Sequence, residues 1–164
     1  VYSPKGFFNA NLEKITIKSL LPNFNLGEPI LFSITNKQNM KFLGKGWSHL
    51  EQWGVWSIEK NPYIVMPIPT QLSASLHLTV RAYNPEHKIQ RVFIGVNGHL
   101  PLEFQFTDDS IQKIALKIPK LGAENQLMRI NFYVPDSASP LSLGRGSDSR
   151  DLGIGIISAT IVGN

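Results

Sequence analysis

Apolar and polar residues alternate along much of the chain with a period of two. In ASLHLTVRA, residues 74–82, the side chains of Leu76, Leu78 and Val80 share one face, and polar side chains share the other. The same alternation recurs in three more segments: Leu102–Phe106, Ile114–Ile118 and Ile130–Val134. A period of two is typical of strands that bury one face, so the pattern predicts antiparallel sheet with one solvated side.

A tight turn joins two further predicted strands. Gln90–Val96 is a dense apolar run that ends in Asn97-Gly98. An Asn-Gly pair favours a type I′ turn, because both central residues of that turn need positive φ. We therefore expect Gln90–Val96 and His99–Phe106 to form a hairpin.

The two ends of the chain also predict strands. Glu13–Ser19 and Pro29–Ile34 have strand composition, with a Pro/Asn/Gly turn segment between them. In Leu152–Val162 the apolar residues change phase midway. Such a change indicates either a β-bulge or a strand buried on both faces.

The number of strands defines the expected fold class. No window predicts a helix, and about eight to ten short strands bounded by turns are typical of two packed sheets. We predict an all-β fold, a galactose-binding-like jelly-roll β-sandwich of two antiparallel sheets, with an immunoglobulin-like sandwich as the alternative. A length of 164 residues suits one domain that spans residues 1–164.

Composition narrows the function classes. The chain has a net charge of +4 and a charged share of 17%, but its basic residues are scattered, whereas nucleic-acid binding needs a concentrated basic surface. It has no cysteine, so neither a disulfide nor a thiolate zinc site is available. No apolar stretch of about 18 residues exists, so we expect no direct membrane insertion by this segment. The start VYSPKGFFNA lacks a signal peptide and an initiator Met, so we expect a piece excised from a longer protein.

All three tryptophans lie in one window, GKGWSHLEQWGVWS, residues 44–57. If the chain is extended there, Trp53 and Val55 face one side and Trp56 the other, although Gly54 allows a kink. We expect Trp53 and Trp56 to serve mainly in packing, because exposing an indole is costly. Trp47 lies in a loop-like context and is as well suited to face a ligand as to pack.

Four polar residues are candidates to assist the indoles. A carboxylate beside exposed indoles, as at Glu51, is a common sugar-binding arrangement. We favour a structural role for Glu51, in which it pairs with an arginine or caps local backbone N–H groups. Arg150 is expected to form a structural pair with Glu51 or Asp148. Arg145, in a Gly-rich loop, is the better ligand candidate of the two arginines. The full candidate ligand-binding set is Trp47, Glu51, Trp53, Trp56, Asn97, Arg145 and Arg150.

Metal and catalytic motifs are weak. The four histidines show no metal-ligand spacing, and no G-x-S-x-G motif suggests a hydrolase triad. The pair Asp108-Asp109 has two interpretations, a structural calcium site and a solvated hairpin turn, and we favour the turn. We therefore expect no cofactor and no catalytic residue.

Three motifs resemble one module. They are E-x-W-G-x-W-S at residues 51–57, L-x-L-x-x-x-A-Y at residues 76–83, and SDSRDLGIGI at residues 147–156. Together they resemble the C-terminal β-domain of periplasmic phosphoglycerol transferases and related bacterial envelope glycosyltransferases, over roughly Lys45–Gly163. The segment Ser139–Arg150 is fuller here than the motif requires.

The resemblance implies an accessory module at the C-terminal end of a larger membrane protein, on the periplasmic side of a bacterial inner membrane. In that family the chemistry belongs to a separate metal-dependent domain. We therefore predict a non-catalytic module that binds envelope glycan beside the catalytic domain of its parent. The alternative is a structural or protein-interaction domain that packs against that catalytic domain.

Overall fold

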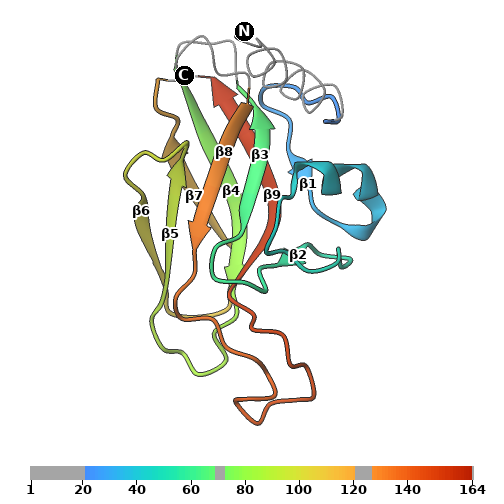
Figure 1. Ribbon diagram of the computed structural model, residues 1–164, viewed down its shortest axis with the longest axis vertical. Coiled ribbons are helices and arrows are strands. Elements are labelled where there is room, and N and C mark those ends of the chain that lie inside the picture. The colour runs from blue at the N-terminus through green and yellow to red at the C-terminus, as the bar shows by residue number, and fades with distance from the viewer. Residues whose placement is uncertain (1–20, 69–72, 121–126, 164) are drawn as a thin grey trace, which may run out of the picture.

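The computed structural model describes residues 21–68, 73–120 and 127–163 (Figure 1). The predicted strand Glu13–Ser19 lies outside these residues. The described elements are β1 (Ile30–Leu31), the 3-10 helix η1 (Ile34–Phe42), β2 (Val55–Trp56), β3 (Tyr63–Pro67), β4 (Ala74–Ala82), β5 (Gln90–Val96), β6 (Leu102–Phe106), β7 (Gln112–Lys117), β8 (Leu127–Tyr133) and β9 (Ile154–Gly163).

The strands form two antiparallel sheets. The five-stranded sheet has the order β1-β9-β4-β7, and β2 also pairs with β9. The four-stranded sheet has the order β3-β8-β5-β6. With β2 set aside, β1 pairs with β9, β3 with β8, β4 with β7 and β5 with β6. This nested pairing is a jelly roll, and it confirms the predicted fold class.

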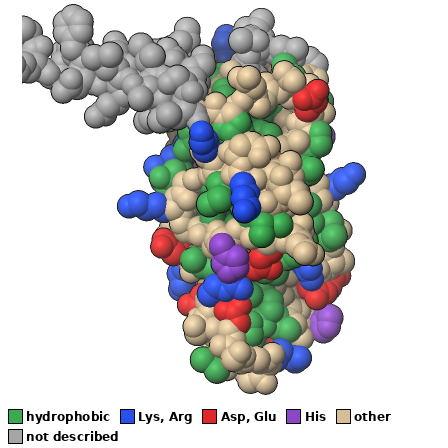
Figure 2. All heavy atoms as spheres, turned by 90° about the vertical axis from the view of Figure 1, so that its right-hand side faces the viewer, with side chains coloured by type: hydrophobic (Ala, Val, Ile, Leu, Met, Phe, Trp, Pro, Cys, Tyr) green, Lys and Arg blue, Asp and Glu red, His purple; other side chains and the backbone are tan. Residues whose placement is uncertain are grey.

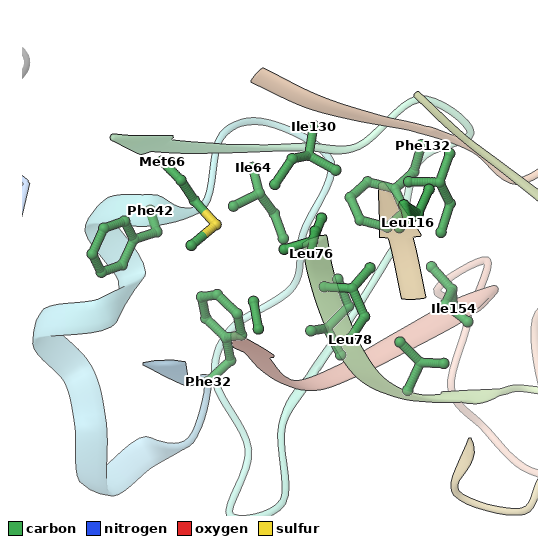
Figure 3. Close-up of a cluster of buried hydrophobic side chains, with 14 of the residues drawn as sticks. Phe32, Phe42, Ile64, Met66, Leu76, Leu78, Leu116, Ile130, Phe132 and Ile154 are labelled. Carbon is green, nitrogen blue, oxygen red and sulfur yellow. The ribbon is translucent and has the colours of Figure 1, made fainter. Parts of the chain in front are cut away.

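The core lies between the sheets (Figure 3). Leu76 and Leu78 of β4 face Ile64 of β3 and Ile130 of β8, and each of the four is at most 1% exposed. Their sequence neighbours point outward, as the alternation predicts. Each such aliphatic side chain contributes roughly 1.5–3 kcal/mol when fully buried, so the inward rows supply most of the stabilisation.

The predicted hairpin is confirmed, with a shorter second strand. β5 pairs with β6 from Gln90↔Phe106 to Ile94↔Leu102, and Asn97 and Gly98 have φ of 47° and 77°. The predicted strand at His99–Phe106 instead begins at Leu102. Pro101 lacks a backbone N–H, so it cannot extend the ladder toward the turn.

The phase change in the last strand is a β-bulge. Thr79 pairs with Ser158 but Val80 pairs with Ile156, so Ile157 is the extra residue of β9. The bulge lets Ile156 before it and Ala159 after it both face the core, where each is fully buried.

The expectation of strand over Pro29–Ile34 and of no helix was wrong in part. Only Ile30–Leu31 forms strand, and η1 begins at Ile34. A 3-10 helix buries little and follows no 3.6-residue pattern, and Phe42 is the one residue of η1 that is buried. Among the described residues, no helix is long and apolar enough to span a membrane.

Candidate functional site

The tryptophan window folds onto the outer face of the five-stranded sheet. Val55 of β2 pairs with Ile156 of β9, and both are fully buried in the core. The next row across the sheet joins Trp56, Gly155 and Arg81. Because successive side chains alternate between the faces of a sheet, Trp56 and Arg81 project outward.

Trp53 lies on the same side as Trp56, against the prediction for an extended segment. The Glu51 N–H donates to the Gly54 carbonyl, so the chain turns there. The rings of Trp53 and Trp56 lie 4.8 Å apart with their planes at 66°. Trp56 is 8% exposed, whereas Trp53 remains partly exposed. Trp56 therefore serves in packing, and the indole of Trp53 shields it from solvent.

A glycine makes room for the indole of Trp53. A Cβ added at Gly155 would lie 2.5 Å from the ring of Trp53, which is closer than atoms can approach. The indole of Trp53 therefore rests directly on the backbone of β9.

Two further side chains surround the indoles. The Arg81 guanidinium lies 5.4 Å from the ring centroid of Trp53 and 5.7 Å from that of Trp56, within the range of a cation–π contact. The ring of Tyr83 meets Trp56 edge-on at 6.1 Å. Arg81 also lies 3.7 Å from Asp109.

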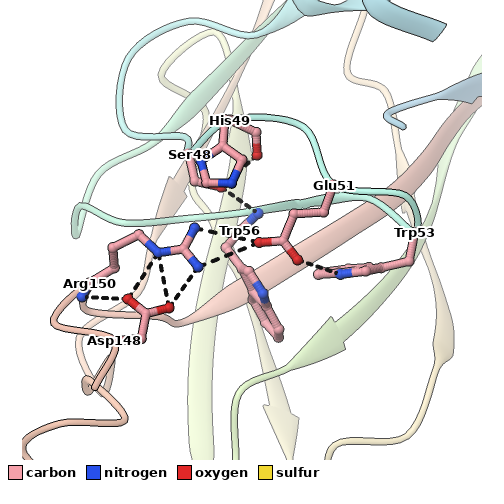
Figure 4. A network of polar contacts seen from close by, with 7 residues as sticks. All are labelled: Ser48, His49, Glu51, Trp53, Trp56, Asp148 and Arg150. Atoms are coloured by element: carbon pink, nitrogen blue, oxygen red, sulfur yellow. Dashed lines mark hydrogen bonds and ion pairs between the residues drawn. The ribbon is translucent and has the colours of Figure 1, made fainter. Parts of the chain in front are cut away.

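A polar network borders Trp53 (Figure 4). The Trp53 Nε1–H donates to Glu51 Oε2 at 2.8 Å. Arg150 donates to Glu51 Oε1 at 3.5 Å and to Asp148 Oδ2 at 2.6 Å, so the predicted pairing of Arg150 is confirmed with both carboxylates. These three side chains are 27–32% exposed, which limits each pair to at most about 1 kcal/mol of stability.

The network also sets ionisation. Hydrogen bonds from the Arg150 side chain lower the pKa of Asp148 to about 2. The Asp148 carboxylate is therefore ionised at neutral pH and cannot donate a proton there.

Figure 2 views the side of the molecule with β1 and β2, where acidic, basic and histidine side chains lie close together around and below the middle.

The indole of Trp47 is held against the core. Its Nε1–H donates to the Tyr63 carbonyl at 2.8 Å, and its ring meets Phe132 edge-on at 5.4 Å. Trp47 is half-buried, and these contacts show a packing role.

Asn97 does not lie in one site with Glu51, and among the described residues Arg145 forms no hydrogen bond or ion pair with Glu51. The Asn97 Oδ1 accepts from the backbone N–H of Arg129 at 2.6 Å, beside the start of β8. The loop with Arg145, Asp148 and Arg150 follows the end of β8, so Asn97 lies toward the opposite end of the sandwich (Figure 1). Arg145 is exposed. The hydrogen bond and charge of Lys88 lower the pKa of Glu86, and the charge of Arg145 adds a smaller contribution.

Arg81 and Tyr83 were missing from the predicted site. The alternation in β4 placed Arg81 on the solvent face, which was the available signal. Its contact with Trp53 could not be inferred, because that contact depends on the long-range pairing of β2 with β9.

Asp108 and Asp109 lie in a turn, which is the interpretation that the sequence favoured. The turn does not join the two strands of a hairpin. Asp108 accepts from the backbone N–H of Ser110 at 2.9 Å and from its hydroxyl. β6 and β7 belong to different sheets, so the turn crosses between the sheets. In the part of the chain that the structure describes, no group of three or more His, Cys, Asp or Glu side chains could hold a metal ion.

Comparison with known families matches residues 25–163 to the model of a domain of unknown function, DUF7024. The chain belongs to this family. No curated protein sequence matches it.

Solved structures with a similar fold include parts of enzymes and isolated modules. The GH115 4-O-methyl-α-glucuronidase BtGH115A, described as specific for decorated arabinogalactans, matches with a TM-score of 0.50 and 8% identity over 87% of this chain and 18% of its own. The CBM36-1 domain of a xylanase from the hindgut metagenome of Trinervitermes trinervoides has a TM-score of 0.45 and 14% identity, over 74% and 88% of the two chains. A family 35 carbohydrate-binding module from an environmental isolate has a TM-score of 0.43 and 13% identity, over 87% of this chain and 86% of its own. The chain thus spans less than a fifth of the glucuronidase.

Proposed function

We propose that this domain is a non-catalytic carbohydrate-binding module. The observation that supports it is the partly exposed indole of Trp53, fixed on the outer face of the five-stranded sheet beside Glu51, Arg81 and Arg150. The ring presents apolar surface to the C–H groups of a sugar. The neighbouring carboxylate and guanidinium groups are still about 30% exposed and can exchange hydrogen bonds with hydroxyls.

The same network argues for binding without chemistry. Glycoside hydrolysis needs two carboxyl groups of which one has a raised pKa and acts as the acid. Glu51 and Asp148 share Arg150, and the pKa of Asp148 is lowered to about 2, which is the wrong direction for that acid. Two carboxylates held by one arginine suit a fixed rim that contacts hydroxyl groups.

The finer proposal concerns the parent protein. The three motifs quoted above support a place in a phosphoglycerol transferase or related envelope glycosyltransferase, on the periplasmic side of the bacterial inner membrane. There the module would raise the local concentration of envelope glycan beside the catalytic domain, as linked modules do. The sequence of the full-length protein tests this. Transmembrane helices and a phosphatase-like domain would support it, and a different catalytic class would contradict it.

One observation favours the alternative of a module that packs on its parent. Leu100 and Leu102 are 93% and 53% exposed, next to a cavity of about 180 Å³ at the ends of β5 and β7. Exposed apolar surface of this kind suits a protein contact.

Tryptophan fluorescence tests the carbohydrate proposal. The domain is titrated with glucan oligosaccharides and lipopolysaccharide sugars, together with the variants Trp53→Ala and Trp47→Phe. Saturable quenching is expected in the wild type and in Trp47→Phe, with loss of binding in Trp53→Ala. Circular dichroism checks that each variant is folded. The absence of a saturable response to every sugar, or equal binding by Trp53→Ala, would contradict the proposal.

A further inference from the structure

The outer face of the four-stranded sheet holds a second group of aromatic and cationic side chains. In β8 the inward residues Ile130 and Phe132 are buried, so Arg129, Asn131 and Tyr133 point outward in one row. Tyr133 is 46% exposed. This row lies on the opposite sheet from Trp53 and is independent of that site.

The guanidinium of Arg129 is held in place by two contacts. Its Cζ lies 3.7 Å from the ring centroid of Tyr63, on β3. Its Nε–H donates to Asn131 Oδ1 at 2.7 Å. Stacking and this single hydrogen bond fix the plane of the guanidinium, and the terminal Nη1 and Nη2 groups have no bond to another described residue.

The backbone of Arg129 is fixed as well. The Asn97 N–H donates to the Arg129 carbonyl, and the Arg129 N–H donates to Asn97 Oδ1. Asn97, which the sequence suggested as a ligand contact, is therefore a positioning residue for Arg129.

Arg129 differs from most other arginines of the domain in its electrostatics. Arg81, Arg91 and Arg150 each lie within 4 Å of a carboxylate. Within the described residues, Arg129 forms no ion pair. The side chain is exposed and no described carboxylate pairs with it, so this end of the face is complementary to an anion.

The other end of the row is aromatic. Phe93 of β5 pairs with Tyr133 across the sheet, and their rings lie 5.9 Å apart with planes tilted by 36°. Arg129 and Tyr133 are four residues apart on one strand, roughly 13 Å at about 3.3 Å per residue. Near the aromatic end Arg91 pairs with Asp136, whereas Glu103, opposite Phe93, keeps its negative charge and accepts a hydrogen bond from the neutral Gln105 amide.

We propose that the row Arg129–Asn131–Tyr133 binds a glycan that contains uronic acid residues. The Nη1 and Nη2 groups of Arg129 fit a planar carboxylate in a bidentate manner. One cation without an ion pair among the described residues matches the single charge of a carboxylate better than the charge of about −1.5 to −2 on a phosphate monoester. The ring of Tyr133 stacks on a sugar ring further along the chain, and the Asn131 amide donates to a hydroxyl between them.

Calorimetric titration with galacturonate, glucuronate and mannuronate oligomers tests this proposal. At least one oligomer is expected to bind the wild type. Arg129→Gln should weaken that binding by about tenfold or more, because a charged bidentate contact is lost. Tyr133→Ala should weaken it too, and reduction of the carboxyl groups of the oligomer should abolish binding at this face. Arg145→Gln, another exposed arginine, is the matched control and should bind as the wild type does.

The outcomes separate this site from that of Trp53. Uronate binding is expected to survive Trp53→Ala. Failure of every uronate oligomer to bind, equal binding by Arg129→Gln, or equal weakening by Arg145→Gln would overturn the proposal. So would displacement of the oligomer by inorganic phosphate at equal concentration. None of these results alters the test of neutral glucan binding at Trp53.

Discussion

The two outer faces of the sandwich use aromatic side chains in different ways. On the five-stranded sheet, Trp53 folds back over Trp56 and rests on Gly155, so one indole covers another. On the four-stranded sheet, Tyr133 projects from the end of β8 and is 46% exposed. The first arrangement comes from a single turn of the chain, and the second from strands far apart in sequence.

The difference teaches how to interpret aromatic residues in a sequence. Tryptophans that lie close together can reach one another through a local turn, and here they close the outer side of a sheet where short β2 pairs with β9. A tyrosine that alternates with buried residues has no local partner to cover it. A cluster of indoles is therefore a weaker sign of an open platform than one aromatic residue on the solvent phase of a strand.

The largest expected effect contrasts the two faces directly. Trp56→Ala should reduce the free energy of unfolding by roughly 3–5 kcal/mol, because it removes a large buried side chain. Tyr133→Ala should cost less than about 1 kcal/mol, because nearly half of that side chain is already in water. Urea unfolding of both variants measures the difference. An equal loss of unfolding free energy in the two variants would contradict the contrast between the two faces.

A medium effect on stability is expected where the indole of Trp53 packs on the backbone of β9 at Gly155. Gly155→Ala should cost roughly 1–3 kcal/mol, because the new Cβ forces the indole of Trp53 away from the sheet. The tryptophan emission should shift to the red as the ring enters water. Thr160→Ala, on the same strand opposite His77, is the control and should leave the emission unchanged. An unshifted spectrum in Gly155→Ala would contradict the packing described here.

The smallest effect concerns acid stability. The pKa of Asp148 is lowered in the folded state from its ordinary 3.8 to about 2. A lowered pKa stabilises the fold at pH above 3.8, and this contribution is lost as the pH falls toward 2. It amounts to at most about 1 kcal/mol, because solvent screens the pair.

Asp148→Asn should therefore flatten the pH dependence of the unfolding temperature between pH 4 and 2, with Asp151→Asn as the control. A residual slope remains in both variants, because Arg91 lowers the pKa of Asp136 as well. An unchanged slope in Asp148→Asn would show that Arg150 does not stabilise the ionised carboxylate.

The sequence predicted the features that depend on neighbours along the chain. Period-two alternation identified β4, β6, β7 and β8, and Asn97-Gly98 indicated the hairpin of β5 and β6. The phase change in the last strand indicated the bulge at Ile157 as one of two alternatives. The 3-10 helix η1 was not predicted, because Phe42 is its one buried residue and leaves no hydrophobic pattern along the helix.

The candidate site could be predicted only in part. Glu51 and Arg150 were paired correctly, because both belong to motifs at the ends of one resemblance. Trp53 lies on the side of Trp56 because the chain turns at Gly54, which is the kink that the sequence left open. Asn97 could not be separated from Glu51, because strand order alone decides which end of the sandwich each occupies.

The three indole N–H groups allow the most direct test of carbohydrate binding. In a ¹H–¹⁵N spectrum, the Nε1–H of Trp53, bonded to Glu51, is followed beside that of Trp47, bonded to the Tyr63 carbonyl, during titration with neutral glucan oligosaccharides. We predict a saturable shift of the Trp53 signal while the Trp47 signal stays in place. Unmoved indole signals throughout the titration would contradict a sugar site at Trp53.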